Sequence, residues 1–235
     1  MASINETLAK LNLGIRDLDN LSLAQLETVF KDLTVREISA LCEVSRRFNS
    51  ICSDESFWRN KVSDDYGIHR KCGDTWRKTA RNMYKINMIN LNTKWIDGRT
   101  YEEILDDALQ NGADCIKGLP EKHLLPYANN DEEDAYFLRY SIGHNENAIQ
   151  DFAHQTYNKT YSNEAINNIL LINSDEINVI YTSVSAYEGI NKHLPGKCYD
   201  FIHNTLSYEF LRKMIDPILY VMQFSSFPNS EIDHA

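Results

Sequence analysis

Residues 21–67 contain three short amphipathic segments with almost no chain between them, and this arrangement constrains the fold more than any other feature of the sequence. Ser22 and Gln25 have the spacing of a capping box at a helix N-terminus, and apolar side chains then recur on one helical stripe. Thr34 and Glu37 repeat the capping-box spacing. We therefore expect the first helix to end near Leu33 and a second helix to begin at once.

The second and third segments continue this pattern. One face of the second segment is apolar, formed by Val35, Ile38, Leu41, Val44, Phe48 and Ile51. Ser53 or Asp54 is expected to cap a third helix, which carries Phe57 and Trp58 and ends at Gly67. A unit of this size buries little core by itself, so we expect it to dock onto another structure.

The order of residues in this stretch resembles the F-box. The spacing agrees without insertion, and the most specific part is the run VSRRF…DESFWR over residues 44–59. The Tyr66-Gly67 pair that follows this run resembles the end of the motif in the F-box-like proteins of large DNA viruses. One position differs, because Ser22 stands where the family usually has proline. Serine keeps the N-cap function but lacks the fixed φ angle and the apolar surface of proline.

This resemblance implies a partner and a set of docking residues. The partner would be a Skp-family adaptor of a cullin–RING ubiquitin ligase. The implied docking residues are Leu21, Ser22, Leu26, Val29, Phe30, Leu33, Ile38, Leu41 and Val44. The same resemblance gives Phe48, Ile51 and Trp58 the role of packing the motif.

Charge divides the chain into two parts near Trp95. Residues 1–94 contain 15 Lys/Arg and 12 Asp/Glu, a net charge of +3, whereas residues 95–235 contain 9 and 22, a net charge of −13. We predict an F-box-like domain with an N-terminal arm at 1–67, an amphipathic linker helix at 68–95 and an acidic helical domain at 96–235. The acidic part disfavours nucleic-acid binding. It suits either a basic protein partner or a solvated surface.

The predicted linker helix combines a basic face with aromatic residues. Asp74 or Thr75 can cap it, and its cations are Arg77, Lys78, Arg81 and Lys85. Such a helix could contact RNA or a membrane surface, or could join two domains with its basic face solvated or paired to acidic neighbours. We adopt the joining role.

The remainder of the chain is predicted to be helical, which makes the fold class all-α. Helical spacing covers 101–111, 133–142, 147–157, 163–172, 176–188, 198–204 and 206–224. A helix end, a polar turn and a new apolar start recur about every 30 residues, near 108–116, 138–149 and 170–180. This recurrence is typical of stacked helical pairs, either a degenerate ankyrin-like array or another paired-helix fold.

No catalytic, metal or cofactor motif is present, so we predict a non-enzyme without cofactor or metal. Cys198 and His203, with Asp200 between them, come nearest to a Cys/His arrangement, but their spacing turns them to opposite helix faces. The chain has five cysteines without metal-ligand spacing, which are expected to be free thiols in a reducing compartment.

Two functions follow from these observations. In the first, the protein is an F-box-like adaptor that brings a target, held by the C-terminal domain, to a Skp/cullin-type ubiquitin ligase. In the second, a structural or scaffolding protein, such as a virus-particle component, keeps the F-box fold without binding a ligase. The N-terminal segment lacks a signal-peptide apolar region and no apolar run has membrane-spanning length. The expected location is cytoplasmic or nuclear, in a host cell or a virion.

Overall fold

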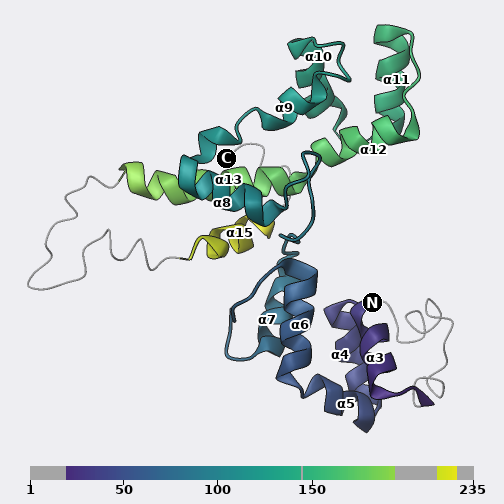
Figure 1. Ribbon diagram of the computed structural model, residues 1–235, viewed down its shortest axis with the longest axis vertical. Coiled ribbons are helices and arrows are strands. Elements are labelled where there is room, and N and C mark those ends of the chain that lie inside the picture. The colour runs from purple at the N-terminus through teal and green to yellow at the C-terminus, as the bar shows by residue number, and fades with distance from the viewer. Residues whose placement is uncertain (1–19, 144, 194–215, 227–235) are drawn as a thin grey trace, which may run out of the picture. The chain divides into compact units, whose positions relative to one another are not determined.

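The computed structural model describes residues 20–143, 145–193 and 216–226 of the chain. The chain forms two compact units, Met1–Asn92 and Thr93–Ala235, drawn in Figure 1. Over the described ranges the regular structure is helical apart from one isolated bridge between Lys94 and Thr100, which confirms the predicted all-α class. Among the described helices, none combines the length and apolar character that a membrane span requires.

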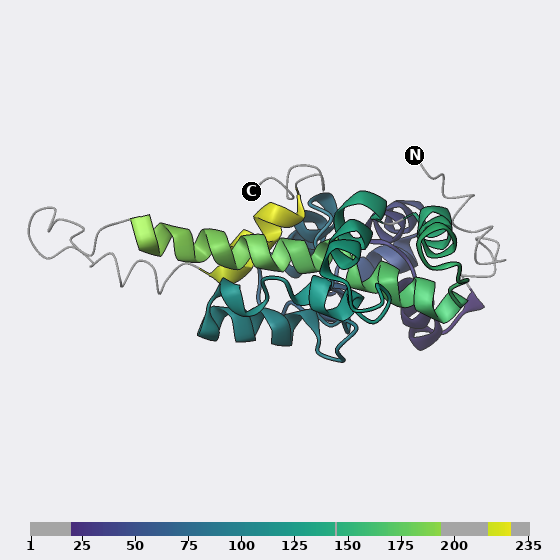
Figure 2. The same cartoon turned by 90° about the horizontal axis from the view of Figure 1, so that it is seen from above.

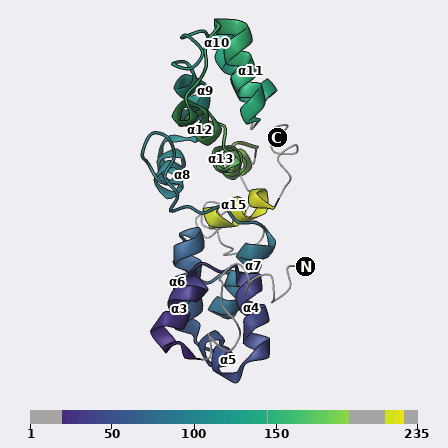
Figure 3. The same ribbon diagram turned by 90° about the vertical axis from the view of Figure 1, so that its right-hand side faces the viewer.

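The described part of the first unit is a helical bundle. Its helices are α3 (Leu23–Lys31), α4 (Val35–Val44), α5 (Arg46–Cys52), α6 (Glu55–Tyr66) and α7 (Trp76–Lys85). Helices α6 and α7 pack along each other, and α5 lies at one end of the bundle (Figures 1 and 3). The predicted capping boxes form at the starts of both α3 and α4.

The predicted second helix is broken at Ser45. This residue has an extended backbone (φ −140°, ψ 133°), and its hydroxyl accepts a hydrogen bond from the Arg47 N–H at 3.2 Å. Serine therefore caps a new helix, α5, in place of continuing α4, as its side chain favours. Phe48 and Ile51 remain buried after the break, so the apolar stripe continues across two helices.

Aromatic rings fill the core of the first unit. Phe30 contacts Phe48 and Phe57 edge-on, with centroids 5.9 Å apart in both pairs. Trp58 is fully buried, and its indole N–H donates to the Cys52 carbonyl at 2.8 Å. Burying Trp58 therefore leaves no unpaired indole donor.

Cysteine pairing differs from the expectation of free thiols. Cys42 in α4 and Cys52 in α5 form a disulfide, with their Cα atoms 6.3 Å apart, inside the range that a disulfide spans. The break at Ser45 makes this contact possible, because it folds α5 back toward α4. Cys115 is a free thiol, and Cys198 lies outside the described residues.

Helix α7 packs within the first unit. It contacts α6 and α4 and buries Ala80 and Met83. Most of the predicted linker range 68–95 thus lies in this unit, because the division of the chain falls between Asn92 and Thr93.

The second unit is built around the long helix α13, which packs against α8 and α15 (Figure 2). Its elements are α8 (Tyr101–Asn111), the 3₁₀ helix η1 (Ala113–Cys115), α9 (Leu119–Leu124), α10 (Glu132–Phe137), the π-helix η2 (Leu138–Ile142), α11 (Glu146–Tyr157), α12 (Asn163–Ile172), α13 (Asp175–His193) and α15 (Pro217–Ser225).

Most predicted helices of this unit agree with the structure. Helices α8 and α12 have the predicted bounds, and α11 begins one residue earlier than expected. The short helix α9 was not predicted. The predicted segment 198–204 and most of 206–224 lie outside the described residues. That the 30-residue recurrence reflects an array of stacked helical pairs stays a prediction.

Long-range hydrogen bonds fix the start of the second unit. The Trp95 indole N–H donates to the Leu171 carbonyl at 3.1 Å, and the Tyr101 and Ser174 hydroxyls lie 2.8 Å apart. The Ala113 N–H donates to Glu188 at 3.1 Å. The first residues of this unit are therefore held by helices that come much later in the chain.

Candidate protein-interaction surfaces

The α3 helix begins at the residue that departs from the F-box pattern. The Ser22 hydroxyl accepts from the Gln25 N–H at 3.3 Å, and the Gln25 side chain accepts from the Ser22 N–H at 2.8 Å. The preceding Leu21 carbonyl accepts a hydrogen bond from the Arg47 guanidinium. Serine thus supplies a complete cap here, and Arg47 of α5 holds the chain that leads into α3.

The predicted docking residues separate into two groups by burial. Leu26, Phe30, Leu33, Ile38 and Leu41 are core residues, each at most 5% exposed. Ser22 is exposed, Leu21 and Val29 are partly exposed, and the side chain of Val44 is outside the description. The buried residues can shape a docking surface from beneath, whereas Leu21, Ser22 and Val29 are available for contact. A docking role for any of them stays a prediction.

A small hollow lies between α3 and α6. Its volume is about 190 Å³, and it is lined by Glu27, Lys31, Ser56, Phe57, Asn60, Lys61 and Asp64. The buried Lys61 ammonium donates to the Lys31 carbonyl at 2.7 Å and to Asp65 at 2.9 Å. Burial raises the pKa of the Asp65 carboxyl, and the hydrogen bond from Lys61 opposes this rise. Lys61 therefore joins the two helices beside the hollow.

The basic face of α7 borders two further hollows. One, of about 530 Å³, is lined by Thr75, Arg77, Lys78, Arg81, Asn82 and Lys85, and a smaller one shares Arg81 and Lys85 with it. The Arg77 guanidinium lies over the Trp58 ring at 5.8 Å, and its buried Nε has no hydrogen-bond partner. The helix that carries this predicted basic face belongs to the first unit, and its cations line the two hollows.

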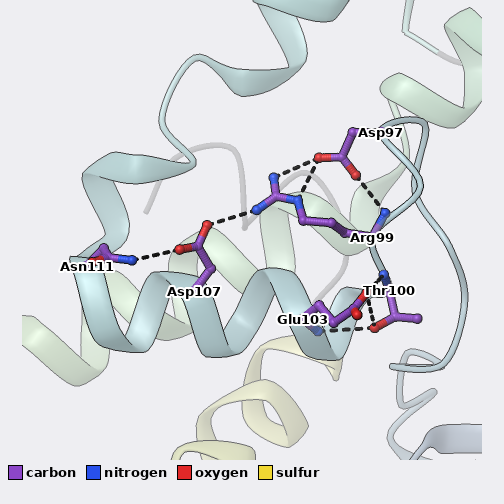
Figure 4. Close-up of polar contacts among 6 residues, drawn as sticks. All are labelled: Asp97, Arg99, Thr100, Glu103, Asp107 and Asn111. Atoms are coloured by element: carbon purple, nitrogen blue, oxygen red, sulfur yellow. Dashed lines mark hydrogen bonds and ion pairs between the residues drawn. The ribbon is translucent and has the colours of Figure 1, made fainter.

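A polar network holds α8 in the second unit (Figure 4). Arg99 pairs with Asp97 at 2.7 Å and with Asp107 at 2.8 Å, and Asn111 donates to Asp107 at 2.7 Å. The hydrogen bond to Asp97 is the main cause that raises the pKa of Arg99. Figure 4 also shows the Thr100–Glu103 capping box at the start of the helix. The carboxylates of Asp97, Glu103 and Asp107 therefore position the start of α8.

Three aromatic side chains form an exposed patch at the end of α10 and in the π-helix. Tyr136, Phe137 and Tyr140 are 59%, 45% and 54% exposed, and we call them the aromatic patch. They were not predicted as a site. Ala135 and Leu138 form the buried stripe of the same segment and leave the larger rings outside it, which the sequence pattern did not indicate.

The described residues contain no group of three or more His, Cys, Asp or Glu side chains placed to hold a metal ion. Cys198, Asp200 and His203 lie outside these residues. Cys115 is exposed, but partial burial of its thiol and the nearby Asp107 carboxylate raise the thiol pKa, which opposes formation of the nucleophilic thiolate.

Comparison with known proteins identifies one domain. A family model described as F-box-like matches residues 25–63, which run from α3 into α6. Neither the curated proteins nor the solved structures contain a match to the chain. Residues 25–63 thus match the F-box-like family model, and domains of that family are helical, non-catalytic protein–protein interaction modules that in general bind Skp-type partners. The match ends at residue 63, before the second unit begins at Thr93.

Proposed function

We propose that this protein is an F-box-like adaptor. The first unit would dock on a Skp-family adaptor of a cullin–RING ubiquitin ligase, and the acidic second unit would hold a target protein. The observation that carries this proposal is the F-box-like match over residues 25–63, in a compact unit separate from the rest of the chain.

The mechanism would be proximity. Tethering a target beside a ubiquitin-charged enzyme raises its effective concentration there, and the chain itself needs no reactive group. Binding energy at protein interfaces is concentrated in few anchoring residues. Leu21 and Val29 of the predicted docking set are the apolar side chains accessible for such a role.

Direct binding to a purified Skp-family adaptor tests the proposal by isothermal titration calorimetry. We expect binding by the wild type and a loss of at least tenfold in affinity for Leu21→Asp/Val29→Asp, because both side chains would face the partner. Tyr84→Ser is the matched control, since Tyr84 is an exposed apolar residue of α7 in the same unit. Absence of wild-type binding to adaptors from a panel of eukaryotic hosts would refute the adaptor function.

A second candidate function is a structural or scaffolding role, including that of a virus-particle component. It is favoured by the burial of five of the nine predicted docking residues and by Ser22 in the usual place of proline. Ser22→Pro separates the two candidates. An adaptor should gain affinity for the Skp-family partner from this change, whereas a scaffold should remain unable to bind it.

A further inference from the structure

We propose that the aromatic patch is a docking surface for a basic segment of a partner protein that carries a large apolar side chain. The inference rests on the proposed adaptor function only in naming that partner as the target. Of the five large hydrophobic side chains exposed in the described residues, three are Tyr136, Phe137 and Tyr140. Such clustering of apolar surface is typical of interaction sites.

The rings of the patch are held in place by their neighbours. Tyr136 and Tyr140 stack with centroids 4.5 Å apart, and Phe137 lies 5.5 Å from Phe152 of α11. The Tyr140 hydroxyl donates to Glu121 of α9 at 2.8 Å. Because these contacts already restrict the rings, the side chains of the patch lose little further conformational entropy when a partner docks there. Tyrosine and phenylalanine are also the residue types enriched at interfaces.

Carboxylates precede the patch in α10 and favour a basic partner, while the charge of the Arg139 guanidinium, 5.9 Å from the Tyr140 ring, is held by inward hydrogen bonds. Asp131 caps α10 and is followed by Glu132 and Glu133, both exposed, in the first turn of the helix that carries Tyr136. Neither glutamate side chain has a hydrogen-bond or ion-pair partner among the described residues. Lysine or arginine side chains that flank an apolar anchor would therefore find carboxylates close to the rings.

A pocket beside the patch adds a specific acceptor. It measures about 190 Å³ and is lined in part by Glu121, Arg139, Tyr140 and Tyr181. Arg139 is directed inward, because it donates to the Ile172 carbonyl at 3.2 Å and to Asn178 at 2.5 Å. Glu121 uses only one carboxylate oxygen, toward Tyr140, and its buried Oε2 has no hydrogen-bond partner. An N–H donor of a basic side chain would satisfy that oxygen.

Fluorescence anisotropy with the purified full chain and synthetic peptides tests this inference. The probe is a short fluorescein-labelled peptide of alternating tryptophan and arginine residues, separated by glycine and serine spacers. We expect saturable binding, weakened about tenfold by Tyr136→Ser/Tyr140→Ser. Glu132→Gln/Glu133→Gln should weaken binding about threefold at low salt and have less effect at high salt. Glu121→Gln should also weaken it.

Matched controls separate this surface from general attraction to an acidic protein. Leu219→Ser removes an equally exposed apolar residue of the same unit, and Asp106→Asn/Asp114→Asn removes two exposed charges elsewhere in it. Both controls should bind the probe like the wild type. Probe peptides with Glu for Arg, or with Ser for Trp, should bind at least tenfold more weakly.

Three results would overturn the inference. They are a wild type that does not bind the probe, equal loss in the patch variant and the Leu219→Ser control, and dimerisation of the free chain that Tyr136→Ser/Tyr140→Ser abolishes. The last would assign the patch to a second copy of the chain. Because no ligase component is present in the assay, failure here leaves the binding test of the Skp-family adaptor unaffected, and the converse also holds.

Discussion

The two units are both helical, yet they differ in charge and in how their contacts span the chain. Residues 1–94 have a net charge of +3 and residues 95–235 a net charge of −13. In the first unit, the Lys61–Lys31 hydrogen bond joins residues 30 positions apart, whereas the Trp95–Leu171 bond of the second unit spans 76. The F-box-like match over residues 25–63 lies within the first unit.

In the proposed adaptor, this difference separates a general task, docking on the ligase, from a particular one, selecting a target. A unit that docks on a shared adaptor must keep a common fold, and the fold of residues 25–63 is common enough for a family model to match. A unit that selects a partner is defined by its exposed side chains, which vary freely on a stable scaffold. The aromatic patch of the second unit is a surface of this second kind.

The largest expected effect comes from a buried tryptophan in each unit. Trp58→Ala and Trp95→Ala should each cost about 3–5 kcal/mol, because both indoles are at most 2% exposed and each donates a hydrogen bond to a backbone carbonyl. Hydrogen exchange read by mass spectrometry should show lost protection in residues 20–92 for the first variant and in the second unit for the other. Loss throughout the chain in either variant would show that the units unfold together.

An intermediate effect is expected in alkali. Burial raises the pKa of Tyr101 to about 12, so its neutral form stabilises the fold below pH 10 and this stability is lost as the pH rises toward 12. The loss amounts to about 2 kcal/mol at pH 12. Tyr101→Phe should remove this loss of stability at high pH. Urea unfolding of the wild type and the variant between pH 9 and pH 12 would measure the difference.

Alkali should also distinguish the units. In the described residues, raised tyrosine pKa values belong to Tyr66 in the first unit and to Tyr101, Tyr140, Tyr157 and Tyr161 in the second. We therefore expect the second unit to lose its helices at lower pH than the first. Circular dichroism of the Trp58→Ala and Trp95→Ala variants during alkaline titration measures the order, and the reverse order would contradict this account.

The smallest effect is expected from matched helix caps. Thr34→Ala in the first unit and Thr100→Ala in the second each remove a complete capping box, at a cost of about 1 kcal/mol. Equal shifts in the urea midpoint of each unit would show that local helix chemistry is the same in both. A larger cost at Thr100 would indicate that the neighbouring Arg99 network depends on the cap.

Local chemistry made much of the fold predictable. The capping boxes at Ser22 and Thr34 marked helix starts that the structure reproduces. The break at Ser45 could not be predicted from periodicity, because Phe48 and Ile51 stay on the apolar stripe even though the helix is interrupted. The sequence pattern reports which face is apolar and is less sensitive to a change of helix axis.

The candidate surfaces were harder to predict. Phe30 and Leu26 belong to the apolar stripe of α3, and only the tertiary packing reveals that both are fully buried while Val29 is partly exposed. Tyr136 and Tyr140 look like core residues in sequence, since aromatic residues are usually buried. Their exposure follows from Ala135 and Leu138, which occupy the inward face.

The hydrogen bond from Trp95 to Leu171 has a consequence for synthesis on the ribosome. The first unit closes on contacts such as Leu91 to Tyr66, so it can fold once its own residues have emerged. Trp95, Tyr101 and Ala113 find their partners only after α12 and α13 have been made. Folding of long-range contacts is slow and leaves apolar surface open in the meantime. We therefore expect the nascent second unit to expose apolar surface for longer than the first unit does.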